Sequence, residues 1–177
     1  VQAGELEEST DEYAVSIAAS LARTYLEAQL PLGLIAYGDQ RYFLPAETGT
    51  GQFDRVLEFL AMSRAEGAVP LVAALANEEA LWGYKSTVIV ITSSNRGDWV
   101  RALRELSKRR VQVAVILVDA TSFGGCHETL DVVPELYAAG LPPYLVRRGD
   151  SIPVALKRPY TLRDSEAPTE LEEVASR

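Results

Sequence analysis

The sequence contains 177 residues with a formal net charge of -8 at pH 7, and 47% of the residues are apolar. The acidic charge excludes a general nucleic-acid binder, because a negative surface repels phosphate backbones. No apolar run approaches the roughly 20 residues that a membrane-spanning helix requires, and the single cysteine, Cys126, excludes an internal disulfide. We therefore expect one globular domain in a reducing compartment.

The first predicted elements are a helix and a hairpin. Ser9 and Glu12 have the spacing of a capping box, and apolar residues follow at helical intervals, which predicts an amphipathic helix. Residues 32–37 have the pattern of a buried strand, and turn residues at 38–39 lead into a second strand at residues 42–44. Together these two strands predict a short antiparallel hairpin.

The rest of the chain alternates predicted helices with apolar strands. Strands are predicted at residues 87–92, 111–118 and 144–146, and helices near residues 53–67, 70–81, 99–110 and 132–140. The β-branched run at 87–92 is typical of a strand covered on both faces, so we expect it in the middle of the sheet. This order predicts an α/β fold with a mostly parallel central sheet, helices on both faces and one short antiparallel edge strand.

The ends of the chain differ from its body. We assign residues 1–9 to a polar lead-in, 10–162 to the folded domain and 163–177 to an acidic tail. In an alternating α/β pattern a strand normally precedes each helix, but this chain begins with a helix. Residues 1–8 are too polar to form a central strand. We therefore expect a first strand upstream of Val1, in a longer protein.

Polar residues gather after two predicted strands, where open α/β sheets bind their ligands. The candidate partner-binding residues are Ser93, Ser94, Asn95, Arg96, Asp98, Asp119, Thr121 and Phe123. Arg96 and Phe123 are the expected anchors, because arginine and aromatic side chains dominate interface energies. The purely structural alternative is that Asn95 or Asp98 caps the next helix while the serines shape the turn.

A catalytic reading depends on His127, the one histidine. Nucleophilic catalysis requires a base within hydrogen-bond reach of the nucleophile and an acid behind that base, and no Gly-x-Ser-x-Gly elbow is present. We expect His127 and Cys126 to be loop residues, and we expect no cofactor. The enzymatic alternative is a hydrolase or nucleotide-binding protein with Ser93, Asn95, Asp119 and His127 in one pocket.

Several segments carry a resemblance to known proteins. They are residues 13–23 (YAVSIAASLAR), 32–38 (LGLIAYG), 67–71 (GAVPL), 86–92 (STVIVIT), 115–125 (VILVDATSFGG) and 146–150 (VRRGD). Taken in order, they span most of residues 10–156 and resemble the bacterial family called domain of unknown function 58, whose members are similar to von Willebrand factor A domains. That resemblance implies a Rossmann-like fold with a short antiparallel strand at the hairpin.

The resemblance also implies a setting. It implies the cytoplasmic domain of a membrane-anchored protein that serves in assembly or as a chaperone together with a MoxR-type AAA+ ATPase. Because the residues offer no self-sufficient catalytic set, we expect a non-enzymatic interaction domain. A-type domains often carry a metal-ion-dependent adhesion site, so a metal-dependent adhesion module is a further alternative. Here residues 67–70 (GAVP) precede the third helix and Ser93 stands where that site has an Asp. We therefore expect no metal, because Mg²⁺ prefers carboxylate and other hard oxygen ligands.

Overall fold

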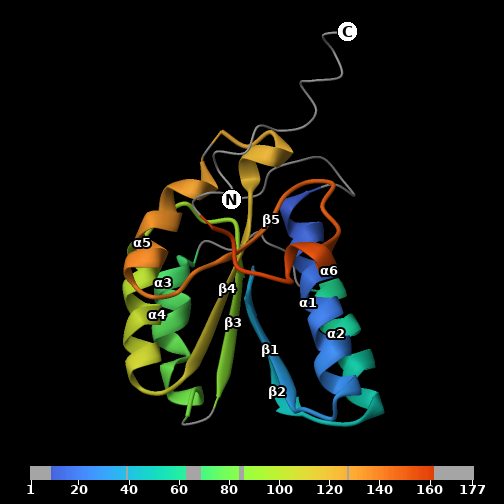
Figure 1. Ribbon diagram of the computed structural model, residues 1–177. Coiled ribbons are helices and arrows are strands. Elements are labelled where there is room, and N and C mark those ends of the chain that lie inside the picture. The colour runs from blue at the N-terminus through green and yellow to red at the C-terminus, as the bar shows by residue number, and fades with distance from the viewer. Residues whose placement is uncertain (1–8, 39, 63–68, 84–85, 127, 162–177) are drawn as a thin grey trace, which may run out of the picture.

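The computed structural model describes residues 9–38, 40–62, 69–83, 86–126 and 128–161. Within these residues the strands form two sheets (Figure 1). A parallel sheet has the order β3–β4–β5, formed by Thr87–Thr92, Gln112–Val118 and Tyr144–Val146. A hairpin pairs β1 with β2, which are Leu32–Tyr37 and Arg41–Glu47. The predicted α/β class and the predicted hairpin are confirmed.

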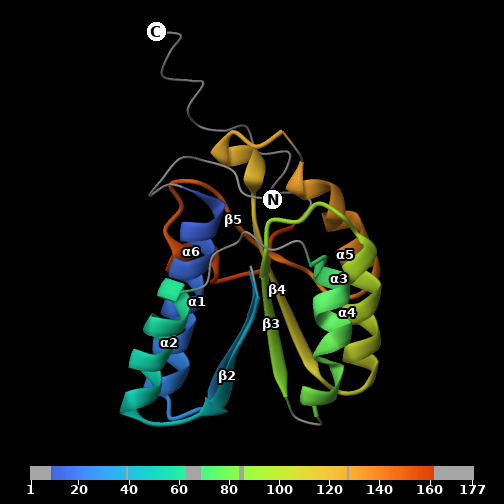
Figure 2. The same cartoon turned by 180° about the vertical axis from the view of Figure 1, so that it is seen from behind.

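Helices cover both faces of the strands (Figures 1 and 2). One side carries α1 (Thr10–Glu27), α2 (Thr50–Met62) and α6 (Ile152–Ala155). The other side carries α3 (Leu71–Asn77), α4 (Asp98–Lys108) and α5 (Val133–Ala138). Short 3-10 helices are η2 (Glu79–Leu81), η3 (Ala120–Phe123) and η4 (Thr129–Val132). No helix in the part of the chain that the structure describes is long and apolar enough to cross a membrane.

Helix α1 packs against both sheets. It begins after Ser9, whose hydroxyl accepts the Glu12 N–H at 3.2 Å, so the predicted cap is confirmed. Ile17 is fully buried in a cluster with side chains of β4 and β5, and Ala22 is fully buried in a second cluster with α2 and the hairpin. Because the apolar stripe of α1 is shared in this way, one helix holds the hairpin beside the parallel sheet.

The largest apolar cluster lies between the parallel sheet and helices α3, α4 and α5. Trp99, Leu103, Leu117 and Leu136 have no exposed surface within it. Burial of each of these side chains stabilises the fold by roughly 1.5–3 kcal/mol. The cluster therefore fixes β3 and β4, whose carboxyl ends carry the candidate site.

Strand β3 differs from its prediction. Residues 87–92 were expected mid-sheet, but β3 is an edge strand of the parallel sheet and β4 is its centre. Of the β3 side chains only Val90 is buried, and the others are partly or fully exposed. The apolar run reflects helices on both faces of the strand, whereas the order of strands depends on pairing that a local pattern does not encode. The hairpin likewise forms its own sheet instead of an edge of the central one.

Some predictions fall on residues outside the described ranges. These are the segments 1–8 and 163–177, the helix end at Gly67, the turn residue Asp39 and the loop residue His127. Helix α6 was not predicted, although Ser151 stands at its N-cap position and Pro153 lies in its first turn.

A carboxylate ties the hairpin to the helix on its other side. Glu78, at the end of α3, accepts hydrogen bonds from the Tyr37 hydroxyl at 2.5 Å and from Nε and Nη2 of Arg41 at 2.5 and 2.8 Å. The Glu78 side chain is only 4% exposed. The Arg41 guanidinium is the main reason why the pKa of Glu78 lies below its usual value. The hairpin is thus held to α3 by charge-assisted hydrogen bonds.

We expect Glu78→Gln to lower the free energy of unfolding by about 1–3 kcal/mol, because the amide loses the charge-assisted bonds to Arg41. Urea unfolding at pH 7 measures this loss. Glu79→Gln is the matched control, because Glu79 is 59% exposed in its ion pair with Arg109 and should change stability by less than about 1 kcal/mol.

The difference in stability between wild type and Glu78→Gln should depend on pH. Because the pKa of Glu78 is lowered in the folded state, its contribution is present above the ordinary carboxyl pKa and is lost as the pH falls through the folded-state value. The difference in stability between wild type and Glu78→Gln should therefore shrink from pH 7 to about pH 3. A difference that stays constant over this range would contradict the ion pair.

Candidate interaction site at the carboxyl edge of the parallel sheet

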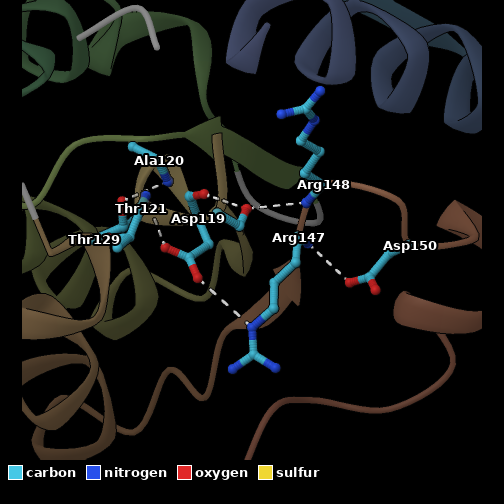
Figure 3. A network of polar contacts seen from close by, with 8 residues as sticks. Asp119, Ala120, Thr121, Thr129, Arg147, Arg148 and Asp150 are labelled. Carbon is cyan, nitrogen blue, oxygen red and sulfur yellow. Dashed lines mark hydrogen bonds and ion pairs between the residues drawn. The ribbon is translucent and has the colours of Figure 1, made fainter. Parts of the chain in front are cut away.

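Thr129 joins the two loops that follow β3 and β4. Its side chain is fully buried, and its hydroxyl accepts the Ala120 N–H at 2.9 Å (Figure 3). The same hydroxyl donates to the carbonyl oxygen of Ser93 in a longer contact of 3.5 Å. The loops after β3 and β4 therefore lie next to each other, and a residue that the sequence did not single out connects them.

Asp119 fixes the end of β4. Its side chain is 7% exposed, and Oδ1 accepts the Thr121 N–H at 3.1 Å, which caps η3. Oδ2 lies 3.6 Å from Nε of Arg147, at the end of β5 (Figure 3). The backbone N–H of Asp119 donates to the carbonyl of Val146 at 2.9 Å and extends the pairing of β4 with β5. Asp119 thus holds its own loop and the loop after β5 together.

Ser122 provides a second connection between these loops. Its hydroxyl donates to the Asp119 carbonyl oxygen at 2.6 Å and accepts the Arg148 N–H at 2.9 Å. The turn after β5 is closed by Asp150, whose Oδ2 accepts the Arg147 N–H at 2.8 Å (Figure 3). Side-chain oxygens therefore satisfy the backbone donors of this edge, and the loops after all three parallel strands are linked to one another.

Helix α1 supports the same edge through Tyr13. The Tyr13 ring meets the Phe123 ring edge-on, with centroids 4.8 Å apart and an interplanar angle of 77°. The Tyr13 hydroxyl accepts the N–H of Gly149 at 2.8 Å, where the chain has a positive φ of 84°. Phe123 is only 4% exposed. We therefore assign Phe123 to the support of η3, and its predicted role as an exposed anchor is not available in this conformation.

The loop after β3 is shaped by side chains of Thr92 and Ser94, and the predicted helix cap does not form. The Ser94 N–H donates to Oγ1 of Thr92 at 3.1 Å, and the Arg96 N–H donates to Oγ of Ser94 at 3.4 Å. Helix α4 starts from Gly97 without a side-chain cap. The expectation that a serine shapes this turn is confirmed, whereas capping by Asn95 or Asp98 is wrong. The N-cap position is held by Gly97, which has no side chain that could accept a backbone N–H of α4.

Exposed groups of the candidate set lie around this network. Asp98, Thr121 and Arg96 are exposed, and Ser93, Ser94 and Asn95 are partly buried. The Arg96 side chain is 73% exposed and forms an ion pair of 3.6 Å with Asp98. Such a surface pair is worth little, so Arg96 can exchange Asp98 for another acidic group at low cost.

The structure also contains an open depression of about 360 Å³ beside β5 and α6. Its polar lining includes Arg147, Asp150, Arg158 and Tyr160. Of the enzymatic alternative, the described residues Ser93, Asn95 and Asp119 do not line it. Both oxygens of the Asp119 carboxylate already contact the protein, one the Arg147 side chain and the other the Thr121 N–H. Cys126 is an exposed free thiol. Among the residues that the structure describes, no three His, Cys, Asp or Glu side chains are grouped to hold a metal ion.

The role of Thr129 can be measured. We expect Thr129→Val to lower the free energy of unfolding by about 1–3 kcal/mol, because the buried Ala120 N–H loses its acceptor. Amide hydrogen exchange at Ala120 should accelerate as well. Thr129→Ser keeps the hydroxyl and should stay within about 1 kcal/mol of wild type. A loss for Thr129→Ser without a loss for Thr129→Val would show that the methyl group, and not the hydrogen bond, is the important part of Thr129.

Comparison with known proteins places the chain in a family. The family model described as "Protein of unknown function DUF58" matches residues 2–122, which is more than half of the chain. The match includes α1, the hairpin, β3 and β4 and ends within η3, so Thr129 and Arg147 lie beyond it. No curated protein and no solved structure matches the chain. The chain belongs to the DUF58 family.

Proposed function

We propose that this chain is a non-enzymatic protein–protein interaction domain, and that its contact surface is the carboxyl edge of the parallel sheet. The observation that carries the proposal is the linked set of loops at this edge. Asp119, Ser122 and Thr129 hold the loops in one arrangement, while the neighbouring Arg96 and Thr121 are exposed. A rigid edge with exposed polar groups favours binding, because little conformational entropy is lost when a partner docks.

We propose a MoxR-type AAA+ ATPase as the partner, in an assembly or chaperone-like system at the membrane. The support for this partner is the resemblance to the DUF58 family and the membership of the chain in that family. In the full-length protein, the domain would face the cytoplasm beside a membrane anchor. The partner's contact surface should be acidic where it meets Arg96, because complementary charge sets the orientation of docking.

The test is a pull-down of the purified ATPase with the immobilised domain. Arg96→Glu should reduce the ATPase affinity by about tenfold or more, because a negative charge would then face the acidic surface proposed for the partner. Arg23→Glu is a matched control: Arg23 is 71% exposed in α1 and also pairs with a nearby carboxylate, Glu27, at 2.9 Å. This control should bind the ATPase as wild type does.

The possible outcomes test the contact surface and the identity of the partner separately. Equal recovery of the ATPase by wild type and Arg96→Glu would refute the carboxyl edge as the contact surface. Equal weakening by both charge reversals would indicate a general charge effect and would refute it too. Failure of all proteins, wild type included, to retain the ATPase would refute the proposed partner.

A further inference from the structure

The open depression beside β5 and α6 combines charged and apolar groups. Its volume is about 360 Å³, at the lower end of the range for ligand pockets, so it suits a small ligand or the end of a larger one. Its polar side includes two arginines, Arg147 and Arg158, and its apolar side includes Leu145, Val154 and Ala155. A ligand that fills the depression would therefore need both an anionic group and an apolar group.

Arg147 offers the depression a hydrogen-bonding fork. Its side chain is 44% exposed, and its Nε lies 3.6 Å from Oδ2 of Asp119. The two Nη atoms point away from Asp119 (Figure 3). The guanidinium also lies over the ring of Tyr160, with Cζ 5.9 Å from the ring centroid. Asp119 and the ring thus position a planar group that can give two parallel N–H bonds to an oxyanion.

Tyr160 supplies a buried donor to the same lining. The residue is only 8% exposed, and its hydroxyl has no hydrogen-bond partner among the described residues. The backbone of Tyr160 is fixed, because its N–H donates to the Pro143 carbonyl at 2.7 Å and its carbonyl accepts the Tyr137 hydroxyl. A buried hydroxyl without a partner is costly and rare in native proteins. The orphaned hydroxyl of Tyr160 is therefore a second and independent sign of a bound acceptor.

The remaining lining residues select the class of anion. Asp150 belongs to the lining, and its Oδ2 accepts the Arg147 N–H at 2.8 Å. This fixed negative charge repels a dianion such as phosphate more strongly than a carboxylate, which carries a single charge. Val154 is 60% exposed beside these polar groups. A branched apolar group attached to the carboxylate would remove that exposed surface from water.

We propose that this depression binds a carboxylate that carries a short branched apolar group. The Arg147 fork holds the two carboxylate oxygens, the Tyr160 hydroxyl donates to one of them, and Val154 contacts the apolar group. Two sources share this chemistry, a free short-chain acid and the C-terminal residue of a peptide. The site does not depend on the proposed ATPase partner.

The experiment is an NMR titration of the 177-residue chain with 4-methylpentanoate. The backbone amide signals of Arg147, Asp150 and Ser151 should shift in a saturable way, with a Kd of about 1 mM or tighter. 4-Methylpentanamide lacks the charge and acetate lacks the branched group, so each should bind at least about tenfold more weakly. A parallel titration with N-acetyl-glycyl-leucine distinguishes the sources. Tighter binding of this peptide assigns the site to a peptide C-terminus, and tighter binding of 4-methylpentanoate assigns it to a free acid.

Two variants test the residues of the site. Tyr160→Phe removes only the hydroxyl, so it should weaken 4-methylpentanoate binding by about fivefold, while the melting temperature stays the same or rises because the folded chain loses no bond. Tyr144→Phe is the matched control, since Tyr144 packs on the α1 side of β5 and does not line the depression. Arg147→Lys keeps a positive charge beside Asp119 but loses the fork, and it should weaken binding by about tenfold.

Several results would overturn the proposal. One is the absence of saturable binding by both carboxylates. Another is equal binding of the amide, which would indicate apolar adsorption, or equal binding of acetate, which would indicate an adventitious ion only. Wild-type affinity in Tyr160→Phe or in Arg147→Lys would also overturn it, because the carboxylate would then bind without the hydroxyl or the fork. So would an equal loss of affinity in Tyr144→Phe and Tyr160→Phe, since the loss would not be specific to the depression.

Discussion

The fold depends on the packing of α1 against two sheets that share no backbone hydrogen bonds. Ile17 and Ala22, five residues apart on this helix, are both fully buried, one in the cluster of the parallel sheet and the other in that of the hairpin. At its N-terminal end the same helix supplies Tyr13, which supports Phe123 and Gly149 at the carboxyl edge. Loss of α1 would therefore remove the apolar packing that joins the two sheets and the support of the candidate site together, and only the bonds of Tyr37 and Arg41 to Glu78 would still hold the hairpin to α3.

Two buried carboxylates also hold distant segments of the fold together. Glu78 joins the hairpin to α3 and Asp119 joins the loops after β4 and β5, and each side chain is less than a tenth exposed. Burying a carboxylate is costly, and an arginine beside it offsets that cost only in part. In both cases the arginine is nearly half exposed and the carboxylate also accepts a neutral donor, the Tyr37 hydroxyl or the Thr121 N–H. These carboxylates fix the relative positions of segments far apart in the sequence more than they raise stability.

Much of the fold could be predicted because its signals are local. The Ser9 cap, the helical spacing after it and the β-branched run at 87–92 each depend on a few neighbouring residues. The edge position of β3 could not be predicted, because apolar faces show which layers cover a strand and not which strands pair with it. At the site, Asp119 could be found from its place after a strand, but Thr129 could not. Its hydroxyl meets Ala120 nine residues away and Ser93 thirty-six residues away, and no sequence pattern marks that meeting. The burial of Phe123 by Tyr13 is a tertiary contact of the same kind.

Strand β3 leads directly into the loop that carries the exposed Arg96, so the order of the strand bears on the proposed contact surface. Ile91 is two residues before Ser93, whose carbonyl receives the Thr129 hydroxyl. The loop therefore starts from a fixed point, because the carbonyl of its first residue is held by a side chain from the neighbouring loop. Thr92, the last residue of β3, adds a second hold: its hydroxyl accepts the Ser94 N–H, and the Ser94 hydroxyl accepts the Arg96 N–H. The order that pairing with β4 imposes on β3 thus continues through Thr92 and Ser94 into the turn that carries Arg96.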